Sequence, residues 1–156
     1  MTRRDLLRSA VAAALAGLLG CSGGVPEYGE VEGTVTLKGK PLANVEVVFM
    51  PDAESGTSGQ SASAYTDERG RYRLWCEPAQ LHGAVVGTHR VCVHDIAAMP
   101  LPPLEDGATD GTGKAYRPQP LRVPSRYSDA RQTPLRGVEV RPGAQTLDFD
   151  VKHAPR

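Results

Sequence analysis

Apolar and polar residues alternate in short segments over most of this chain. In residues 31–38, for example, Val31, Val35 and Leu37 are separated by polar residues or glycine. Side chains of a strand point alternately to its two faces, so a period of two predicts a strand with one buried face. A chain patterned in this way builds its core from sheets.

Turn residues separate seven such segments: 31–38, 45–50, 61–66, 71–76, 88–94, 135–140 and 145–151. Short strands in this number are typical of two packed antiparallel sheets. The sequence therefore predicts one all-β domain, residues 31–156, folded as a seven-stranded antiparallel β-sandwich. We expect the first two segments to form a hairpin through the turn at residues 39–41.

Residues 66–70 have the composition of a tight turn between two of these strands. Asp67 can accept hydrogen bonds from the backbone that follows it, and Gly70 can adopt the positive φ that closes a bulged hairpin. We expect Asp67 and Gly70 to define this structural turn.

Residues 96–124 break the alternation with six prolines and three glycines. Breakers at this density disfavour both strand and helix. A loop of this length in a compact domain is usually either functional or disordered, and the composition of this one favours disorder.

The first twenty residues have the order of an export signal. A basic segment (residues 1–8) precedes a small, apolar segment (residues 9–19), and Gly20 and Cys21 follow. The apolar run is too short to cross a bilayer, which takes roughly 20 residues. We therefore expect a cleaved signal peptide at residues 1–20.

Residues 18–21, Leu-Leu-Gly-Cys, resemble the lipobox of bacterial lipoproteins, although Leu19 stands where Ala or Ser is usual. The resemblance implies cleavage between Gly20 and Cys21, lipidation of Cys21, and a lipidated tether at residues 21–30. Two or three acyl chains hold a protein on a membrane, whereas one does so marginally. We expect the protein on the periplasmic or outer face of a bacterial membrane.

The basic segment also resembles the twin-arginine export motif, with Leu6 where Phe is usual and Arg8 where Lys is usual. The resemblance implies export in a folded state. A general export signal that happens to contain Arg3 and Arg4 is the alternative.

The charge balance argues against nucleic acid as a partner. The chain has 18 basic and 18 acidic side chains, and removal of the first twenty residues takes few of either kind. Phosphate binding needs several Lys or Arg on one face, whereas here they are interspersed with acidic residues.

Residues 31–49 (Val-Glu-Gly-Thr-Val-Thr-Leu-Lys-Gly-Lys-Pro-Leu-Ala-Asn-Val-Glu-Val-Val-Phe) and 66–74 resemble the carboxypeptidase regulatory-like family. Residues 83–91, with 124–127 and 133–135, are similar to small bacterial envelope lipoproteins that carry this domain alone. The resemblance implies an immunoglobulin-like, transthyretin-like sandwich. In larger relatives the module is a non-catalytic appendage, which implies binding or structure.

Signatures of related or common enzymes are missing. Residues 56–59 do not complete the Gly-x-Ser-x-Gly nucleophile elbow. No His is followed by Glu three residues later, as in the zinc pair of carboxypeptidases, and residues 152–156 differ from the Tyr-Arg-Gly-Ser end of the hydroxyisourate hydrolases. We expect neither an enzyme nor a cofactor.

Candidate metal ligands are sparse, and we expect no metal site. His89 and His94 point to opposite faces of one strand. His82 lies on a loop, so a site with His89 stays open beside the expectation of solvated imidazoles. Four aspartates lack the spacing of a calcium loop, and we expect them to be solvated: Asp106, Asp110, Asp148 and Asp150.

Trp75 alternates out of phase with Leu74 and Cys76, so its indole should face solvent beside Arg73. An exposed aromatic patch would indicate contact with a carbohydrate or a protein. An isolated surface aromatic is the alternative, and Trp75 is the candidate interaction residue.

Cys76 and Cys92 could pair in an oxidising compartment. We expect them on neighbouring antiparallel strands, with Cys76 facing inward and Cys92 outward, whereas a disulfide needs both Cβ atoms on one side. The sequence predicts no disulfide, a buried Cys76 and an exposed or half-covered Cys92. A bulge near Trp75 or Glu77 would reverse this expectation.

Two functions fit these features. The first is a lipid-anchored, non-catalytic module of the cell envelope that holds a protein partner or the wall polymer at the membrane. The alternative is a small-ligand or metal-binding lipoprotein with residues 96–124 as a lid, which requires a pocket beneath that loop.

Overall fold

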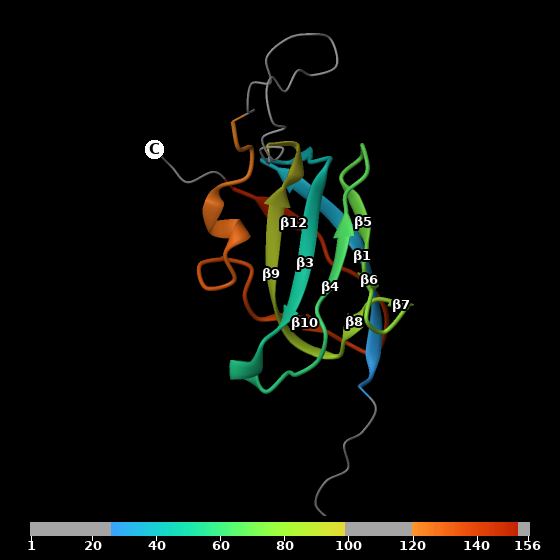
Figure 1. The fold of residues 1–156 in the computed structure, drawn as a ribbon. Coiled ribbons are helices and arrows are strands. Elements are labelled where there is room, and N and C mark those ends of the chain that lie inside the picture. The colour runs from blue at the N-terminus through green and yellow to red at the C-terminus, as the bar shows by residue number, and fades with distance from the viewer. Residues whose placement is uncertain (1–25, 99–119, 153–156) are drawn as a thin grey trace, which may run out of the picture.

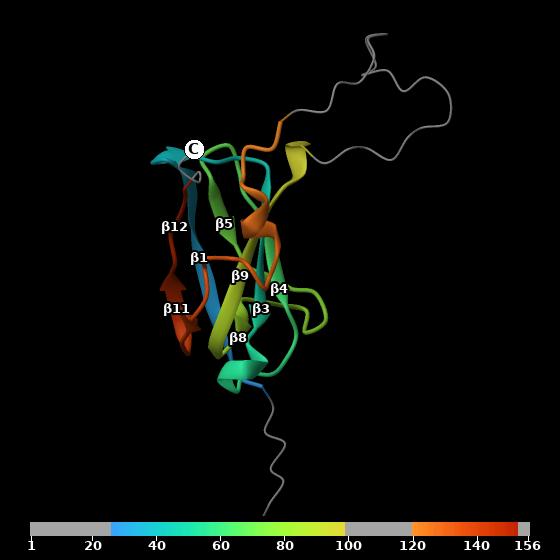
Figure 2. The same cartoon turned by 90° about the vertical axis from the view of Figure 1, so that its left-hand side faces the viewer.

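The computed structural model describes residues 26–98 and 120–152, which form two β-sheets around a common core (Figures 1 and 2). In this part of the chain, no helix is long and apolar enough to cross a bilayer. The strands are β1 (Tyr28–Leu37), β2 (Lys40–Pro41), β3 (Val45–Pro51), β4 (Ala62–Tyr65), β5 (Arg71–Arg73), β6 (Trp75–Cys76), β7 (Leu81–His82), β8 (Ala84–Val85), β9 (Gly87–Asp95), β10 (Val138–Val140), β11 (Gly143–Thr146) and β12 (Phe149–Val151). Three short 3₁₀ turns are η1 (Ala53–Ser55), η2 (Ile96–Ala98) and η3 (Ser125–Ser128).

The long strand β1 is the centre of the first sheet. Along one edge, β8, β5 and β2 pair with it in antiparallel fashion, and along the other edge β11 and β12 run parallel to it. The second sheet has the order β10-β9-β3-β4-β6-β7 and is antiparallel throughout. The pairing thus departs from the predicted antiparallel pattern where β11 and β12 meet β1, because the chain crosses to the first sheet after β10.

The predicted hairpin between residues 31–38 and 45–50 is wrong, because β1 and β3 belong to different sheets. After β1 the chain pairs back through the two-residue strand β2 and then crosses to the second sheet at Asn44, whose φ is 56°. Leu42 is buried in this crossing, and its carbonyl accepts a hydrogen bond from the Thr66 hydroxyl at 2.8 Å. These contacts direct the chain from β1 to the second sheet.

The buried face predicted for residues 31–38 is confirmed, since Val31 and Val35 are fully buried and Leu37 lies half-buried against the core. Phe49 lies near its centre, with ring centroids 6.4 Å from Tyr72, 6.0 Å from Phe149 and 5.8 Å from His89. Burial of such apolar surface is the main stabilising contribution in a domain of this kind. The fully buried apolar side chains include Val31, Val35, Val45, Val47, Leu74, Val91, Val93 and Val151.

The link between β11 and β12 passes very close to β1. A Cβ built on Gly33 would lie 1.9 Å from the carbonyl oxygen of Leu147. That oxygen accepts a hydrogen bond from Tyr72 Oη at 2.6 Å, and the Leu147 N–H donates to the Glu32 carbonyl at 2.8 Å. Position 33 therefore requires glycine.

Two strand boundaries differ from the prediction. β1 begins at Tyr28, so the last three residues of the predicted tether, 21–30, pair with β8 and β11 instead. The predicted strand 71–76 divides at Leu74, because β5 pairs with β1 whereas β6 pairs with β4. Alternation continues through Leu74, so the sequence does not reveal this change of partner.

The turn at residues 66–70 has the predicted geometry. Gly70 has a φ of 72°, and Asp67 Oδ1 accepts hydrogen bonds from the N–H groups of Arg69 and Arg71, each at 2.9 Å. The strands that it connects, β4 and β5, lie in different sheets, so it is a crossover between sheets and not the expected hairpin turn.

Gly70→Val is expected to lower the free energy of unfolding by about 2 to 3 kcal/mol. The positive φ disfavours a β-branched side chain, and a Cβ at this position would lie 2.5 Å from the Val35 carbonyl oxygen. Urea denaturation at equilibrium measures the change. An unaltered midpoint would show that the turn tolerates a side chain.

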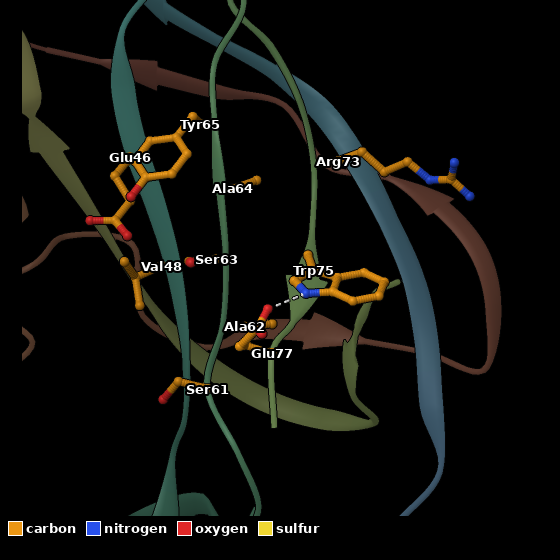
Figure 3. A pocket seen from close by; sticks show the side chains of 10 residues that line it. All are labelled: Glu46, Val48, Ser61, Ala62, Ser63, Ala64, Tyr65, Arg73, Trp75 and Glu77. Atoms are coloured by element: carbon orange, nitrogen blue, oxygen red, sulfur yellow. Dashed lines mark hydrogen bonds between the residues drawn. The ribbon is translucent and has the colours of Figure 1, made fainter. Parts of the chain in front are cut away.

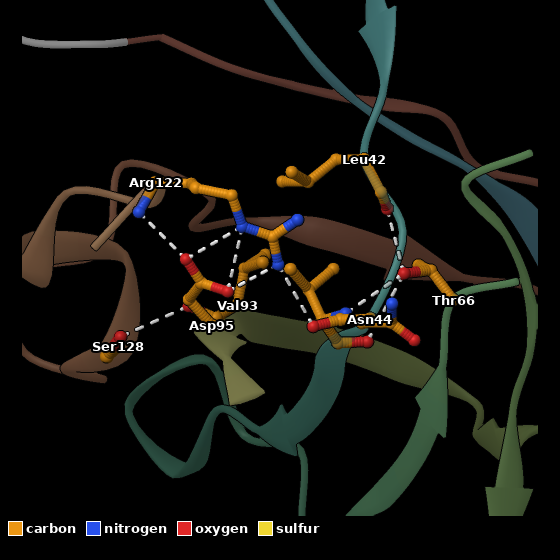
Figure 4. Close-up of polar contacts among 8 residues, drawn as sticks. Leu42, Asn44, Thr66, Val93, Asp95, Arg122 and Ser128 are labelled. Carbon is orange, nitrogen blue, oxygen red and sulfur yellow. Dashed lines mark hydrogen bonds and ion pairs between the residues drawn. The ribbon is translucent and has the colours of Figure 1, made fainter. Parts of the chain in front are cut away.

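The two described ends of the predicted loop 96–124 are structured, and residues 99–119 lie outside the described residues. Residues 96–98 form η2, although no helical turn was expected there. On the returning side, Arg122 Nε lies 3.1 Å from both carboxylate oxygens of Asp95, and the Arg122 N–H donates to Oδ2 at 2.8 Å (Figure 4). Burial alone would raise the pKa of Asp95, but the hydrogen bonds from Arg122 hold it below its usual value.

Candidate functional site

A groove of about 570 Å³ lies on the outer face of the second sheet, over β3, β4 and β6 (Figure 3). The strand register sets Val48, Ser63 and Trp75 side by side across this face. Because β4 contributes small residues between larger neighbours, the surface is hollow along this strand. The lining residues are Glu46, Val48, Ser61, Ala62, Ser63, Ala64, Tyr65, Arg73, Trp75 and Glu77.

Trp75 faces outward beside Arg73, as predicted, but it is half-buried and not fully solvated. Its Nε1–H donates to Glu77 Oε2 at 2.6 Å, and its ring meets that of His82 edge-on at 4.9 Å. Glu77 Oε1 in turn accepts from Gln80 Nε2 at 3.0 Å. The indole is thus held in one orientation before any ligand arrives.

The groove has a second aromatic residue in its lining, Tyr65. Tyr65 is 66% exposed, and the register places it beside Glu46. Arg73 also borders the groove, but its guanidinium pairs with Glu30 at 3.1 Å, over the first sheet. Sequence reasoning missed Tyr65 and Glu46. Alternation in residues 61–66 indicates an outward Tyr65, but its neighbours depend on the strand register.

The remaining predicted site residues are dispersed. Gly20 and Cys21 lie outside the described residues. The described chain enters β1 at the end of the molecule that carries η1, whereas the two ends of the loop 96–124 lie at the opposite end (Figure 1). The turn of Asp67 and Gly70 also lies at that opposite end (Figure 1).

Cys76 and Cys92 are free thiols, as predicted, but two expectations about Cys92 are wrong. The strands β3 and β4 separate β9 from β6, so the cysteines are not on neighbouring strands. Cys92 is fully buried although it points outward, because residues 120–135 cover that face of β9. Burial, with a smaller contribution from Asp129, raises the pKa of the Cys92 thiol.

His89 is fully buried, contrary to the expected solvated imidazole, since it shares the inward phase of Val91. Its Nδ1 lies 3.1 Å from the Gly87 carbonyl oxygen, which places the proton on Nδ1. Its Nε2 has no hydrogen-bond partner among the described residues. Burial lowers the pKa of His89, and the hydrogen bond to Gly87 opposes that shift weakly.

The lowered pKa predicts that acid destabilises the domain through His89. Below about pH 6.5 the unfolded chain binds a proton at this position that the folded chain rejects, so stability falls by at most about 1.4 kcal/mol per pH unit. Urea midpoints between pH 8 and pH 5 measure the slope. His89→Leu should flatten this slope; equal slopes in wild type and His89→Leu would contradict this assignment.

Within residues 26–98 and 120–152, no three His, Cys, Asp or Glu side chains lie close enough to hold a metal ion. Asp148 and Asp150 are exposed but have structural partners, contrary to the expected free solvation. Asp148 Oδ1 accepts the Thr34 N–H at 2.7 Å, and Asp150 Oδ1 accepts the Gly39 N–H at 3.0 Å. These two hydrogen bonds link the segment around β12 to β1 and to the turn that follows β1.

No family model matches this chain, and comparisons with curated proteins and with solved structures found no match either.

Proposed function

We propose that this protein is a lipid-anchored, non-catalytic module of the bacterial cell envelope that binds a partner through the groove over β4. The observation that carries the proposal is the outward aromatic pair Tyr65 and Trp75 around a hollow floor of small residues. Buried or half-buried aromatics supply much of the energy at protein interfaces. Neither catalysis nor a cofactor is part of this function.

The proposed anchor is Cys21, after cleavage of a signal peptide at Gly20. Six residues lie between Cys21 and Tyr28, where β1 begins, and the seven steps from one to the other reach at most about 25 Å. The domain would therefore stay close to the membrane, with the end that carries η1 toward it (Figure 1). Twin-arginine or general export would both deliver it there.

We further propose the immunoglobulin-like topology of the carboxypeptidase regulatory-like family. The seven predicted segments correspond to β1, β3, β4, β5 with β6, β9, β10, and β11 with β12, which supports a seven-stranded description. In that family the domain is an appendage, which agrees with a binding or structural role.

The alternative, a ligand-binding lipoprotein with residues 96–124 as a lid, has less support. At the described ends of that loop, Val123 is buried and Arg122 pairs with the buried Asp95. The groove over β4 contains no residue from either end.

Cys21→Ser is expected to abolish membrane attachment, because the thiol is the proposed acyl acceptor. Detergent phase partition measures it: wild type should enter the detergent phase, and the variant should stay uncleaved or appear in the aqueous phase. Cys92→Ser is the matched control and should partition like wild type. Detergent partition of Cys21→Ser equal to wild type would contradict the proposed anchor.

Photo-crosslinking in the native envelope tests the interaction. A benzophenone amino acid at position 65 should give one discrete adduct that Trp75→Ala removes. The same probe at position 32, which is exposed on the first sheet, should not give that adduct. Adducts that are equal from both positions, or none from position 65, would count against the groove.

A further inference from the structure

We propose that the groove binds a lysine or arginine side chain presented by a protein partner. This inference rests on the proposed function and names the partner's chemistry at the same site. It follows from the charge of the groove, its aromatic walls and its floor.

Two carboxylates give the groove its charge. Glu46 and Glu77 line it from β3 and from the segment after β6. The hydrogen-bond donors to Glu77, Trp75 Nε1 and Gln80 Nε2, are neutral, so its negative charge is not cancelled. The one cation of the lining, Arg73, pairs with Glu30 at 3.1 Å and points away from the groove (Figure 3). The groove therefore attracts cations and repels phosphates and carboxylates.

The aromatic residues favour a cation further. Tyr65 lies two residues along β4 from Ser63, and Trp75 lies beside Ser63 on β6 (Figure 3). The faces of Tyr and Trp rings attract ammonium and guanidinium groups, with about 0.5 to 1 kcal/mol at exposed sites. The hydrogen bond to Glu77 fixes the indole, so little side-chain freedom is lost on binding.

The floor suits the rest of such a side chain. Ser61 and Ser63 offer hydroxyl oxygens that accept hydrogen bonds from an ammonium or guanidinium group. Val48 offers apolar surface for the methylene stem, which long basic side chains bury while the charged end stays near polar groups.

Trp75 is the one tryptophan of the chain, so its fluorescence reports on this groove alone. The whole lipidated chain in neutral detergent is titrated with acetyl-Gly-Lys-Gly-Lys-Gly-amide and with the matched peptide that carries Gln for Lys. The lysine peptide should give a saturable change that added salt weakens. The glutamine peptide should bind about tenfold more weakly or not at all. Equal binding of both peptides overturns the proposal.

Variants that remove one carboxylate charge test whether Glu46 and Glu77 contribute to the affinity for the lysine peptide. E46Q and E77Q should each weaken the lysine peptide about threefold to tenfold. E68Q makes the same charge change at an exposed position of the 66–70 turn and should leave the affinity unchanged. Equal affinities for wild type, E46Q and E77Q overturn the proposal.

The outcomes separate this inference from the proposed function. A discrete adduct from position 65, together with no response to the lysine peptide, rejects the cationic ligand and leaves the interaction module intact. A fluorescence change with a glycan fragment of the wall in place of the peptide assigns the groove to the polymer and rejects the cation. Loss of both the adduct and the peptide response rejects both.

Discussion

Gly33→Ala is expected to leave little folded protein, because it should lower the free energy of unfolding by about 4 kcal/mol or more. The new Cβ would lie 1.9 Å from the Leu147 carbonyl oxygen and 2.7 Å from its carbon. Hydrogen bonds from Tyr72 and to Glu32 hold the Leu147 peptide in place. Neither β1 nor the chain that crosses it can withdraw without breaking these bonds.

Gly39→Ala is the matched control for this steric effect. Gly39 has a φ of 77° and open space around its Cα, so alanine should cost about 1 to 2 kcal/mol through backbone strain. Far-UV circular dichroism and urea midpoints of both variants measure the difference. A Gly33→Ala protein that unfolds at the midpoint of Gly39→Ala would disprove the close approach of Leu147 to β1.

Arg122→Ala is expected to cost about 3 kcal/mol of unfolding free energy at neutral pH. The variant leaves the Asp95 carboxylate, whose side chain is fully buried, without its guanidinium partner. Arg141→Ala removes a comparable guanidinium from Glu139, but that pair is exposed and should contribute at most about 1 kcal/mol. Equal losses of unfolding free energy in the two variants would show that the buried Asp95–Arg122 pair contributes no more than the exposed pair.

The pH dependence of the Arg122 effect follows from the lowered pKa of Asp95. Ionised Asp95 stabilises the fold at pH values above the pKa of the unfolded chain, near 3.9, and this contribution is lost as pH falls through the lower folded pKa. In Arg122→Ala the buried carboxyl is no longer held ionised. The difference in unfolding free energy between wild type and Arg122→Ala should therefore become smaller in acid. A difference that stays constant with pH would argue against the ion pair.

The sequence predicts which face of its strand a residue occupies, but it does not predict which strand lies beside it. Alternation correctly placed Val31 inward and Trp75 outward, because the face that a residue occupies depends on its own strand. The hairpin between residues 31–38 and 45–50 failed because distant contacts decide the pairing: Thr66 bonds the Leu42 carbonyl and helps direct the chain to the second sheet.

The candidate site shows the same division. Trp75 was found by its phase, but the groove depends on Ser63 of β4, which lies beside Trp75 through the register Ser63↔Trp75. Cys92 was assigned to the surface by its phase, and it is buried because residues 120–135 return over β9. No local feature of the sequence indicates that Ser63 lies beside Trp75 or that residues 120–135 cover Cys92.

The proposed lipid on Cys21 would place this domain at a membrane. The intact mass of the protein extracted from membranes in detergent tests it most directly. We expect a polypeptide that begins at Cys21, with excess mass equal to two or three acyl chains and the glycerol that bears them. A chain that retains residues 1–20, or one in which Cys21 is unmodified, would rule out this anchor.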